Sequence, residues 1–230
     1  MKRILSFISV VALMLVMGSC SKTSPELTTN LRFINLSPNA GILDVYANST
    51  LMVGGVSYNA ASGYQSINSA TSSITISQGG STSVIITGGV GFNADNYYSA
   101  IAYDSVSKLK VDFIQDDRTA PPVGKTYVRF FHYVSGISPI DIIKAGSTAN
   151  KLFAGRTYLD HSIAANNFTA YTAFDPGPFS ISAVVAGTSV LITQLPSFDA
   201  AAGKSYTIVL KGFSKGTGND AIYLGPISDK

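Results

Sequence analysis

The sequence has no tryptophan, a single cysteine and a single glutamate, and only 13% of its residues are charged. One cysteine excludes a disulfide within the chain, so the fold must depend on its apolar core. Because there is only one glutamate, a pair of catalytic carboxylates would have to consist almost entirely of aspartates. No Gly-x-Ser-x-Gly nucleophile motif is present either. These absences favour a protein that is not an enzyme and that has no cofactor.

The lone cysteine, Cys20, follows a segment typical of an export signal. A short basic head precedes an apolar run over residues 4–17, which is too short to span a bilayer as a stable helix. The pattern resembles the lipobox of bacterial lipoproteins, although Met17 stands where leucine is usual. The resemblance implies a signal peptide over residues 1–19 and a covalent lipid such as palmitate on Cys20. The alternative is an ordinary signal peptide that contains a cysteine.

Residues 20–29 are polar, which suits a lipidated tether. Removal of the signal leaves 14 lysines and arginines against 13 acidic residues, so nothing suggests a nucleic-acid partner. No second apolar run of about 18 residues follows, and the lipid is therefore the expected membrane attachment. We expect the chain in the cell envelope, at the outer membrane. Surface lipoproteins of the Bacteroidetes often carry several acidic residues shortly after the cysteine. Here Glu26 is the only acidic residue in that segment. The periplasmic and surface faces both stay open.

An internal repeat organises the rest of the chain. The segment LRFIN at residues 31–35 returns as VRFFH at 128–132, and LDV at 43–45 returns as IDI at 140–142. Further downstream, Tyr64 corresponds to Tyr171. Between the copies lies a polar stretch rich in proline and glycine. The repeat predicts two domains, residues 30–117 and 126–230, joined by a linker over 118–125.

Within each copy, apolar residues alternate with polar ones, as in half-buried strands. Examples are residues 74–76 and 109–113 in the first copy and 179–185 in the second. Turn signals separate these segments at 78–80, 175–178 and 202–204. The Gly88–Gly91 run is expected to be a turn, since no helix follows that could bind phosphate. The fold class is therefore all-β, with two tandem β-sandwich domains of immunoglobulin-like or transthyretin-like type.

The repeated apolar-Arg-Phe and apolar-Asp-apolar segments, the Ser/Thr-Tyr step and the Gly-Lys-Ser-Tyr-Thr segment near the end carry a family resemblance. Together they resemble the domain of unknown function family 4397, present twice over most of residues 30–227. The first copy departs from the family pattern at residues 95–98. The resemblance implies an extracytoplasmic β-sandwich that is frequent on bacterial lipoproteins, and it implies no catalytic residues.

Two arginine and aspartate pairs recur at the same spacing, Arg32 with Asp44 and Arg129 with Asp141. We expect each pair to form a structural ion pair across neighbouring strands, and a ligand-binding role is the alternative.

A second group of carboxylates, Asp112, Asp116 and Asp117, lies at the end of the first copy. These residues either sit in a solvated turn with Arg118 or contribute to a calcium site between the domains. The two histidines, His132 and His161, lack the spacing of metal ligands.

Twelve tyrosines offer rings that could stack on sugars. Those that recur between the copies, Tyr58 and Tyr98 with their counterparts Tyr158 and Tyr206, are expected to pack in the core. Four tyrosines that do not recur form a candidate ligand platform, namely Tyr46, Tyr97, Tyr103 and Tyr223. Ser105 lies in a short Asp-Ser-apolar pattern and is a candidate O-glycosylation site.

Two functional classes remain. The chain is either a binding or adhesion module for a glycan or protein, including a host protein, or a structural spacer or accessory subunit of an envelope assembly. A binding module predicts a pocket in one copy that the other lacks.

Overall fold

The computed structural model describes residues 26–70, 72–144, 151–163 and 168–229. Cys20 and the predicted signal peptide lie outside these ranges. No helix in the described part of the chain is long and apolar enough to cross a membrane. The described chain is built almost entirely of strands, with short 3₁₀ turns at η1 (Val106–Lys108), η2 (Asp160–Ser162) and η4 (Gly218–Asp220).

The chain forms two β-sandwiches in tandem. The strands of the first sandwich are β1 (Thr28–Asn35), β2 (Leu43–Ala47), β3 (Thr50–Val56), β4 (Gln65–Asn68), β5 (Ser72–Gln78), β6 (Val84–Val90), β7 (Tyr97–Tyr103) and β8 (Lys110–Gln115). The strands of the second are β9 (Thr126–His132), β10 (Ile140–Lys144), β11 (Lys151–Arg156), β12 (Thr172–Phe174), β13 (Gly177–Val185), β14 (Leu191–Ala200), β15 (Ser205–Lys211) and β16 (Tyr223–Ser228).

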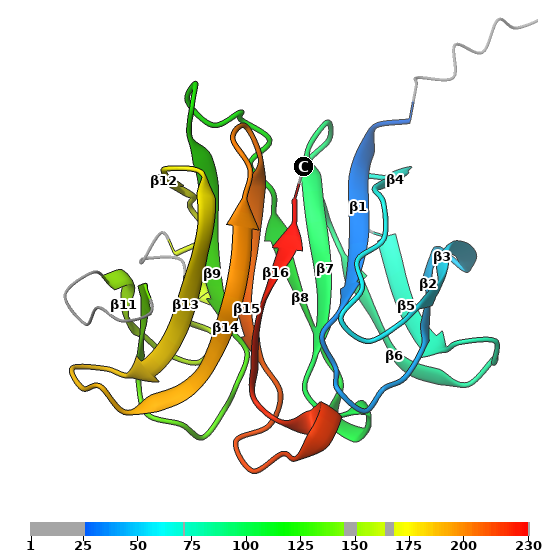
Figure 1. Cartoon of the computed structure of the whole chain (residues 1–230). Helices are drawn as coiled ribbons and strands as arrows, with labels where there is room; N and C mark the ends of the chain where they lie inside the picture. Colours follow the sequence, from blue (N-terminus) through cyan, green and yellow to red (C-terminus); the bar gives the residue numbers. More distant parts are fainter. Residues whose placement is uncertain (1–25, 71, 145–150, 164–167, 230) are drawn as a thin grey trace, which may run out of the picture.

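Strand order is the same in both sandwiches. The inner sheets run β4-β1-β7-β8 and β12-β9-β15-β16, and the outer sheets run β3-β2-β5-β6 and β11-β10-β13-β14. In each inner sheet the first and seventh strands of the sandwich pair in parallel, and the other strand pairs are antiparallel. The two inner sheets face each other, so the molecule has four layers (Figure 1). The all-β, tandem-sandwich fold predicted from the sequence is confirmed.

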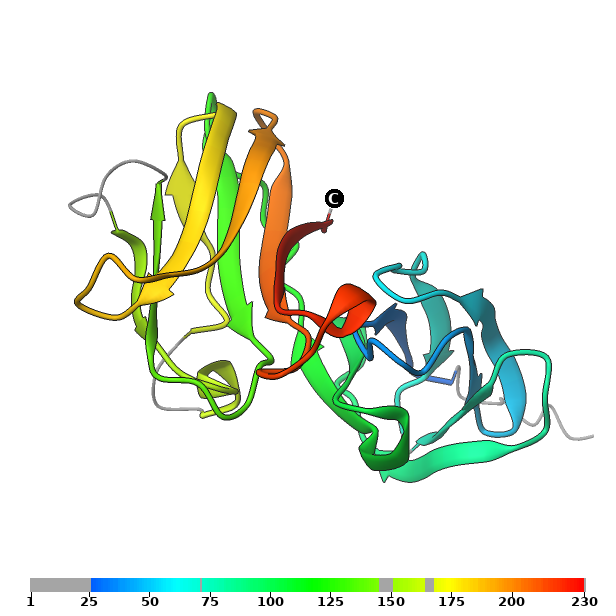
Figure 2. The same ribbon diagram turned by 60° about the horizontal axis from the view of Figure 1, so that its bottom comes forward.

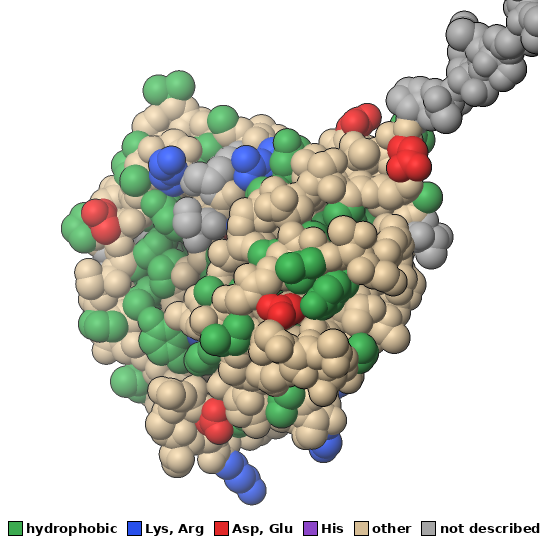
Figure 3. Space-filling view, turned by 90° about the vertical axis from the view of Figure 1, so that its right-hand side faces the viewer, with side chains coloured by type: hydrophobic (Ala, Val, Ile, Leu, Met, Phe, Trp, Pro, Cys, Tyr) green, Lys and Arg blue, Asp and Glu red, His purple; other side chains and the backbone are tan. Residues whose placement is uncertain are grey.

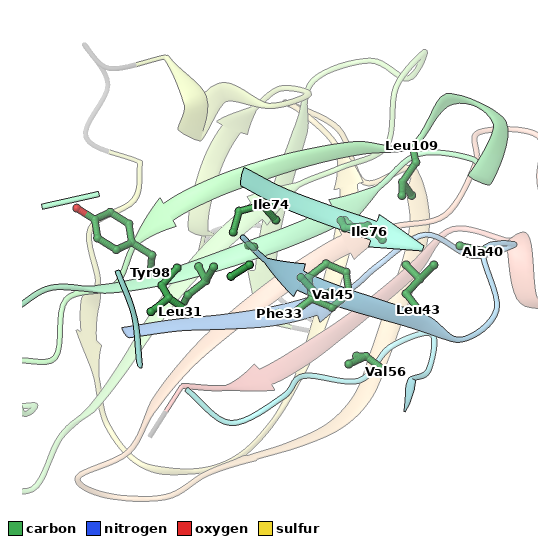
Figure 4. Close-up of a cluster of buried hydrophobic side chains, with 14 of the residues drawn as sticks. Leu31, Phe33, Ala40, Leu43, Val45, Val56, Ile74, Ile76, Tyr98 and Leu109 are labelled. Atoms are coloured by element: carbon green, nitrogen blue, oxygen red, sulfur yellow. The ribbon is translucent and has the colours of Figure 1, made fainter. Parts of the chain in front are cut away.

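The alternation of apolar and polar residues along the strands turns the apolar side chains toward the core of each sandwich. In the first sandwich, Leu31 and Phe33 of β1 meet Val45 of β2 and Ile76 of β5 between the two sheets (Figure 4). Phe130, Ile142 and Ile181 fill the second core in the same way. Each fully buried aliphatic or aromatic side chain stabilises the fold by about 1.5–3 kcal/mol.

The predicted turn at residues 88–91 is wrong in part. Gly88 and Gly89 lie in β6, paired with Ile74 and Ser73 of β5. The absence of a following helix excludes a phosphate loop, but it does not distinguish a turn from a strand, and glycine is rare in strand interiors. Here the backbone ladder with β5 holds the glycines extended.

A third apolar cluster joins the sandwiches. It combines Ile34 and Ile101 of the first inner sheet with Phe131 and Val209 of the second. Tyr103 and Tyr133 meet there with ring centroids 5.0 Å apart. The two bodies are distinct in Figure 2, and they meet along their inner sheets. Apolar burial therefore drives their association.

Lys211, at the end of β15, is buried at this junction with only 1% of its surface exposed. Its Nζ contacts Asn59 Oδ1 of the first sandwich and lies 4.8 Å from the ring centroid of Tyr58 and 5.1 Å from that of Tyr223. Burial lowers the pKa of Lys211 to about 7. The following residue, Gly212, has φ +103°, and a side chain there would collide with the Ala221 carbonyl oxygen.

The low pKa of Lys211 predicts a pH-dependent stability. Unfolded lysine has a pKa of about 10.4, so between pH 7 and 9.5 the unfolded chain binds more protons than the folded one. The free energy of unfolding should rise with pH across this window, by at most about 1.4 kcal/mol per pH unit. Lys211→Met should abolish the rise and be more stable than the parent at pH 7. Urea titrations at pH 7, 8 and 9 measure both effects, and an unchanged slope in the variant would contradict them.

Candidate functional site

A cluster of four buried charges lies at the centre of the junction. Arg32 of β1 pairs with Asp229, which follows β16. Arg129 of β9 pairs with Asp116, which follows β8, at 2.6 Å between Nη2 and Oδ1. The cross pairs are longer, 3.8 Å from Arg32 Nε to Asp116 Oδ2 and 3.9 Å from Arg129 Nη2 to Asp229 Oδ1. Each sandwich thus contributes one arginine and one aspartate, and each of the shortest pairs crosses the junction.

Equivalent hydroxyl groups complete the cluster on both sides. Ser99 of β7 accepts a hydrogen bond from Arg32 Nε at 2.7 Å and donates one to Asp116 at 2.6 Å. Thr207 of β15 does the same between Arg129 and Asp229, at 2.8 and 2.6 Å. These bonds offset part of the cost of removing the charges from water. Arg129 Nη1 is buried without a hydrogen bond, and its guanidinium lies 4.8 and 4.7 Å from the ring centroids of Phe131 and Tyr171.

Two tyrosines also bond to the aspartates of the cluster. Tyr64 donates to Asp116 at 2.8 Å, and Tyr171 donates to Asp229 at 2.9 Å. Burial and the aspartate that each hydroxyl contacts raise the pKa of both tyrosines. Burial alone would lower the pKa of Arg129, but Asp229 and Asp116 outweigh it and raise that pKa. Both arginines therefore stay charged, opposite aspartates that bring the cluster to neutrality.

The ion pairs predicted from the sequence are corrected here. Arg32 lies between Leu31 and Phe33, which face the core, so its side chain points out of the sandwich toward the junction. Asp44 lies between two core residues of β2 in the other sheet, so it points to the opposite outer face. The same geometry separates Arg129 from Asp141. The arginines form buried ion pairs, but with aspartates of the other sandwich.

Asp44 and Asp141 have a different structural task. Asp44 accepts hydrogen bonds from the backbone N–H groups of Gly55 and Gly80, at 2.7 and 2.8 Å. Asp141 accepts them from Gly155 and Gly187, at 2.8 and 2.9 Å. Each carboxylate thus links its own strand to a glycine of the neighbouring strand and to a glycine in a turn of the same outer sheet. This task explains why an aspartate recurs between apolar residues of the repeat.

A groove lies over one edge of the charged cluster, at the end of the molecule where the linker leaves β8. It has a volume of about 420 Å³ and is lined by Asn96, Tyr97, Gln115, Asp116, Asp117, Arg118 and Thr169. Six of these residues come from the first sandwich and the start of the linker, and Thr169 comes from the second sandwich. The groove is within the size range of ligand sites in proteins.

An aromatic and guanidinium stack lies beside the groove and contributes Tyr97 and Arg118 to its lining. The rings of Tyr64 and Tyr97 meet edge to face, with centroids 5.1 Å apart. The guanidinium of Arg118 lies 5.2 Å from the first ring centroid and 5.0 Å from the second. Arg118 also donates to the backbone carbonyl of Asp229 at 2.8 Å, which ties the linker to the second sandwich. Hydrogen-bonding side chains beside a partly exposed ring suit a polar ligand that also has an apolar face.

The structure separates the predicted tyrosine platform. Tyr97 lines the groove, whereas Tyr103 is buried in the junction and cannot offer its face to a ligand. Tyr46 lies on β2 of the outer sheet, and Tyr223 packs on Lys211. Among the recurring tyrosines, Tyr98 is buried in the first core. Tyr206 packs against the second core, while Tyr58 and Tyr158 pack at the junction.

The three carboxylates for which the sequence left a solvated turn or a calcium site open are also separated. Asp116 belongs to the charged cluster, and Asp117 is exposed at the groove. Asp112 Oδ2 accepts a hydrogen bond from His161 Nε2 at 2.7 Å. No group of three or more His, Cys, Asp or Glu residues in the described chain could hold a metal ion. The alternative of a solvated turn is also wrong for Asp116, which is buried.

The two histidines are structural in character. His161 packs on Phe131, with ring centroids 4.4 Å apart, inside the junction. His132 is buried at the end of β9, and burial lowers its pKa to about 4. Ser105 is partly exposed before η1, where O-glycosylation stays a prediction.

Sequence reasoning missed the groove residues Asn96, Gln115 and Arg118. The available signal was the repeat itself, because Asp116 and Asp229 each follow directly on the last strand of a sandwich. That position marks the junction, and the neighbours of Asp116 form the groove.

Comparisons with known proteins give a family and a distant structural likeness. A model of the family described as domain of unknown function (DUF4397) matches residues 29–143, half of the chain. No curated protein matches the chain. One similar solved structure is that of CBMbc, family CBM26, from Eubacterium rectale Amy13K in complex with maltoheptaose. It is 12% identical, the alignment covers 86% of this chain and 97% of that chain, and the TM-score is 0.25. A score this low carries no information on a ligand of the present chain.

The charged cluster predicts a large effect of a single neutralisation. Asp116→Ala removes the closest partner of buried Arg129 and should lower the free energy of unfolding by about 3–5 kcal/mol. Asp199→Ala, at an exposed position on β14, is the matched control and should change it by less than about 0.5 kcal/mol. Urea unfolding of both variants measures the difference. Equal effects would show that the cluster contributes nothing specific.

Proposed function

Because the chain belongs to the domain of unknown function (DUF4397) family, which assigns no activity, we propose from its own geometry that it is a non-catalytic binding module. The observation that carries the proposal is the groove, where Tyr97 offers part of an aromatic ring beside amide, carboxylate and guanidinium groups. Sugars present apolar ring faces together with hydroxyl groups, and they match such a lining. The ligand class we propose is therefore a glycan.

We propose further that residues 126–229 are a second copy of the family domain. The identical strand order of the two sandwiches supports this proposal. So does the equivalence of the cluster residues, because Arg129, Thr207, Tyr171 and Asp229 repeat the contacts of their counterparts in the first sandwich. The predicted boundaries, with a linker over 118–125, belong to the same proposal.

The cell-envelope location is a proposal from the sequence alone. Cys20 would be acylated after removal of residues 1–19, and the lipid would hold the chain at the outer membrane. Two or more acyl chains give stable anchoring, since each buried methylene contributes about 0.8 kcal/mol.

Replacing the lipidated cysteine tests the anchor. Cys20→Ser should move the protein from the membrane fraction to the soluble fraction and abolish its labelling by radioactive palmitate. Ser21→Ala is the control and should behave as the parent. Membrane association of the Cys20→Ser protein without label would contradict the proposal.

A glycan panel tests the groove. Bacterial surface and host oligosaccharides are screened against the purified chain, and the best binder is titrated into Tyr97→Ala. Loss of the ring should weaken binding about tenfold, because a stacked aromatic contributes up to about 1.5 kcal/mol. Tyr46→Ala, on the outer sheet, is the control and should bind as the parent. Binding that Tyr97→Ala leaves unchanged would place the ligand elsewhere.

A panel without any binder would favour the second candidate, a structural spacer or accessory subunit. The junction supports this role, because its buried charges and apolar cluster fix two similar sandwiches against each other. Crosslinking to neighbouring envelope proteins would then identify what the chain positions.

A further inference from the structure

The two sandwiches differ at one edge, where the first contains an apolar slot. The slot has a volume of about 130 Å³ and lies between the edge strands β6 and β8. It is lined by Ile74 and Ile76 of β5, Ile86, Thr87, Gly88 and Gly89 of β6, and Val111 and Phe113 of β8. A cavity of about 150 Å³ with a lining of this kind holds a benzene-sized group.

The second sandwich shows which group belongs in such a slot. Gly88 pairs with Ile74, and at the equivalent place Leu195 pairs with Ile181. Leu195 is buried and belongs to the second core. The first sandwich therefore has no side chain at this position of its edge strand. Ile76 and Ile86, which stand where the second sandwich has Ala183 and Thr193, leave the slot unfilled. Correspondingly, Val111 is only partly buried, whereas its equivalent in the second sandwich, Leu224, is fully buried.

The backbone beside the slot is open to a further strand. β6 is an edge strand of its sheet, and its sequence, VIITGGV, contains no charge or proline. Natural edge strands are usually protected by such residues, and β14 has Pro196 and Asp199. The face that includes this outer sheet carries few charged side chains (Figure 3). A strand added beside β6 would point alternate side chains into the space between the sheets.

We propose that the β6 edge binds an extended segment of a partner protein, which places one leucine-sized apolar side chain in the slot beside Gly88. The segment adds a strand to the outer sheet and supplies the side chain that Leu195 supplies in the second sandwich. Packing of a neighbouring side chain over a strand glycine is a known way to stabilise such positions. This site is separate from the groove and does not depend on glycan binding.

A larger side chain at position 88 should fill the slot. An added Cβ there meets no atom within 4 Å, and the backbone does not have a positive φ. Gly88→Leu should therefore fold, and its melting temperature should rise by about 2–4 °C as the slot fills. Gly91→Leu, just after β6 and equally open, is the matched control.

The probe is a lysine-flanked peptide with the core Thr-Val-Thr-Leu-Thr-Val-Thr, titrated into the isotope-labelled Cys20→Ser chain and followed by NMR. Amide shifts should concentrate on β6 and β8. Replacing the peptide leucine by serine should weaken binding at least tenfold. Gly88→Leu should abolish binding, while Gly91→Leu should bind as the parent. Gly88→Ala should weaken it partially, and it provides the readout if Gly88→Leu does not fold.

Three results would overturn the proposal. One is the absence of shifts at β6 and β8, and another is binding to Gly88→Leu with parental affinity. The third is a concentration-dependent dimer of the chain alone that Gly88→Leu abolishes, since the occupant would then be a second copy. Sedimentation of the chain without peptide detects that case.

Discussion

The two crossed arginine–aspartate pairs at the junction are the constraint from which the rest of the molecule follows. The apolar cluster around them supplies the free energy that brings the inner sheets together. Apolar contacts alone tolerate sliding, whereas two arginines opposite two aspartates are satisfied in one arrangement only. Any other arrangement would leave a buried charge without its partner, at a cost of several kcal/mol. The cluster thus selects one orientation of the sandwiches.

That fixed orientation builds the groove. Asp116 belongs to the cluster, and the residues on either side of it, Gln115 and Asp117, line the groove wall. Arg118 then bonds to the backbone of Asp229 and stacks on Tyr97. If the sandwiches moved apart, Thr169 would no longer face these residues. The candidate site therefore belongs mainly to the first sandwich and is completed at the junction.

The two sandwiches differ at single positions of the junction and of the cores. Tyr103 of the first copy corresponds to Lys211 of the second, and Gly88 corresponds to Leu195. The core positions that face both sheets keep their apolar character in both copies. Differences at edges and around the junction are therefore the places where the two similar sandwiches can acquire different functions.

The fold could be predicted from the sequence because its signals are local. The alternation at residues 74–76 and 179–185 marks strands β5 and β13, whatever lies elsewhere in the chain. Partners of buried charges have no such signature. Arg32 bonds to Asp229, which is 197 residues away, whereas Asp44 lies nearer in the sequence but on the opposite side of the sandwich. Gly88 was misplaced for a related reason, since its environment is set by β5 rather than by its neighbours in sequence.

Differential scanning calorimetry of the intact chain tests the central claim, that the buried cluster makes the two sandwiches one cooperative unit. If the sandwiches unfold as one unit, a single transition is expected, in which the calorimetric and van 't Hoff enthalpies agree. Two separable transitions, or a van 't Hoff enthalpy near half the calorimetric value, would show that the sandwiches unfold independently and that the junction does not bind them.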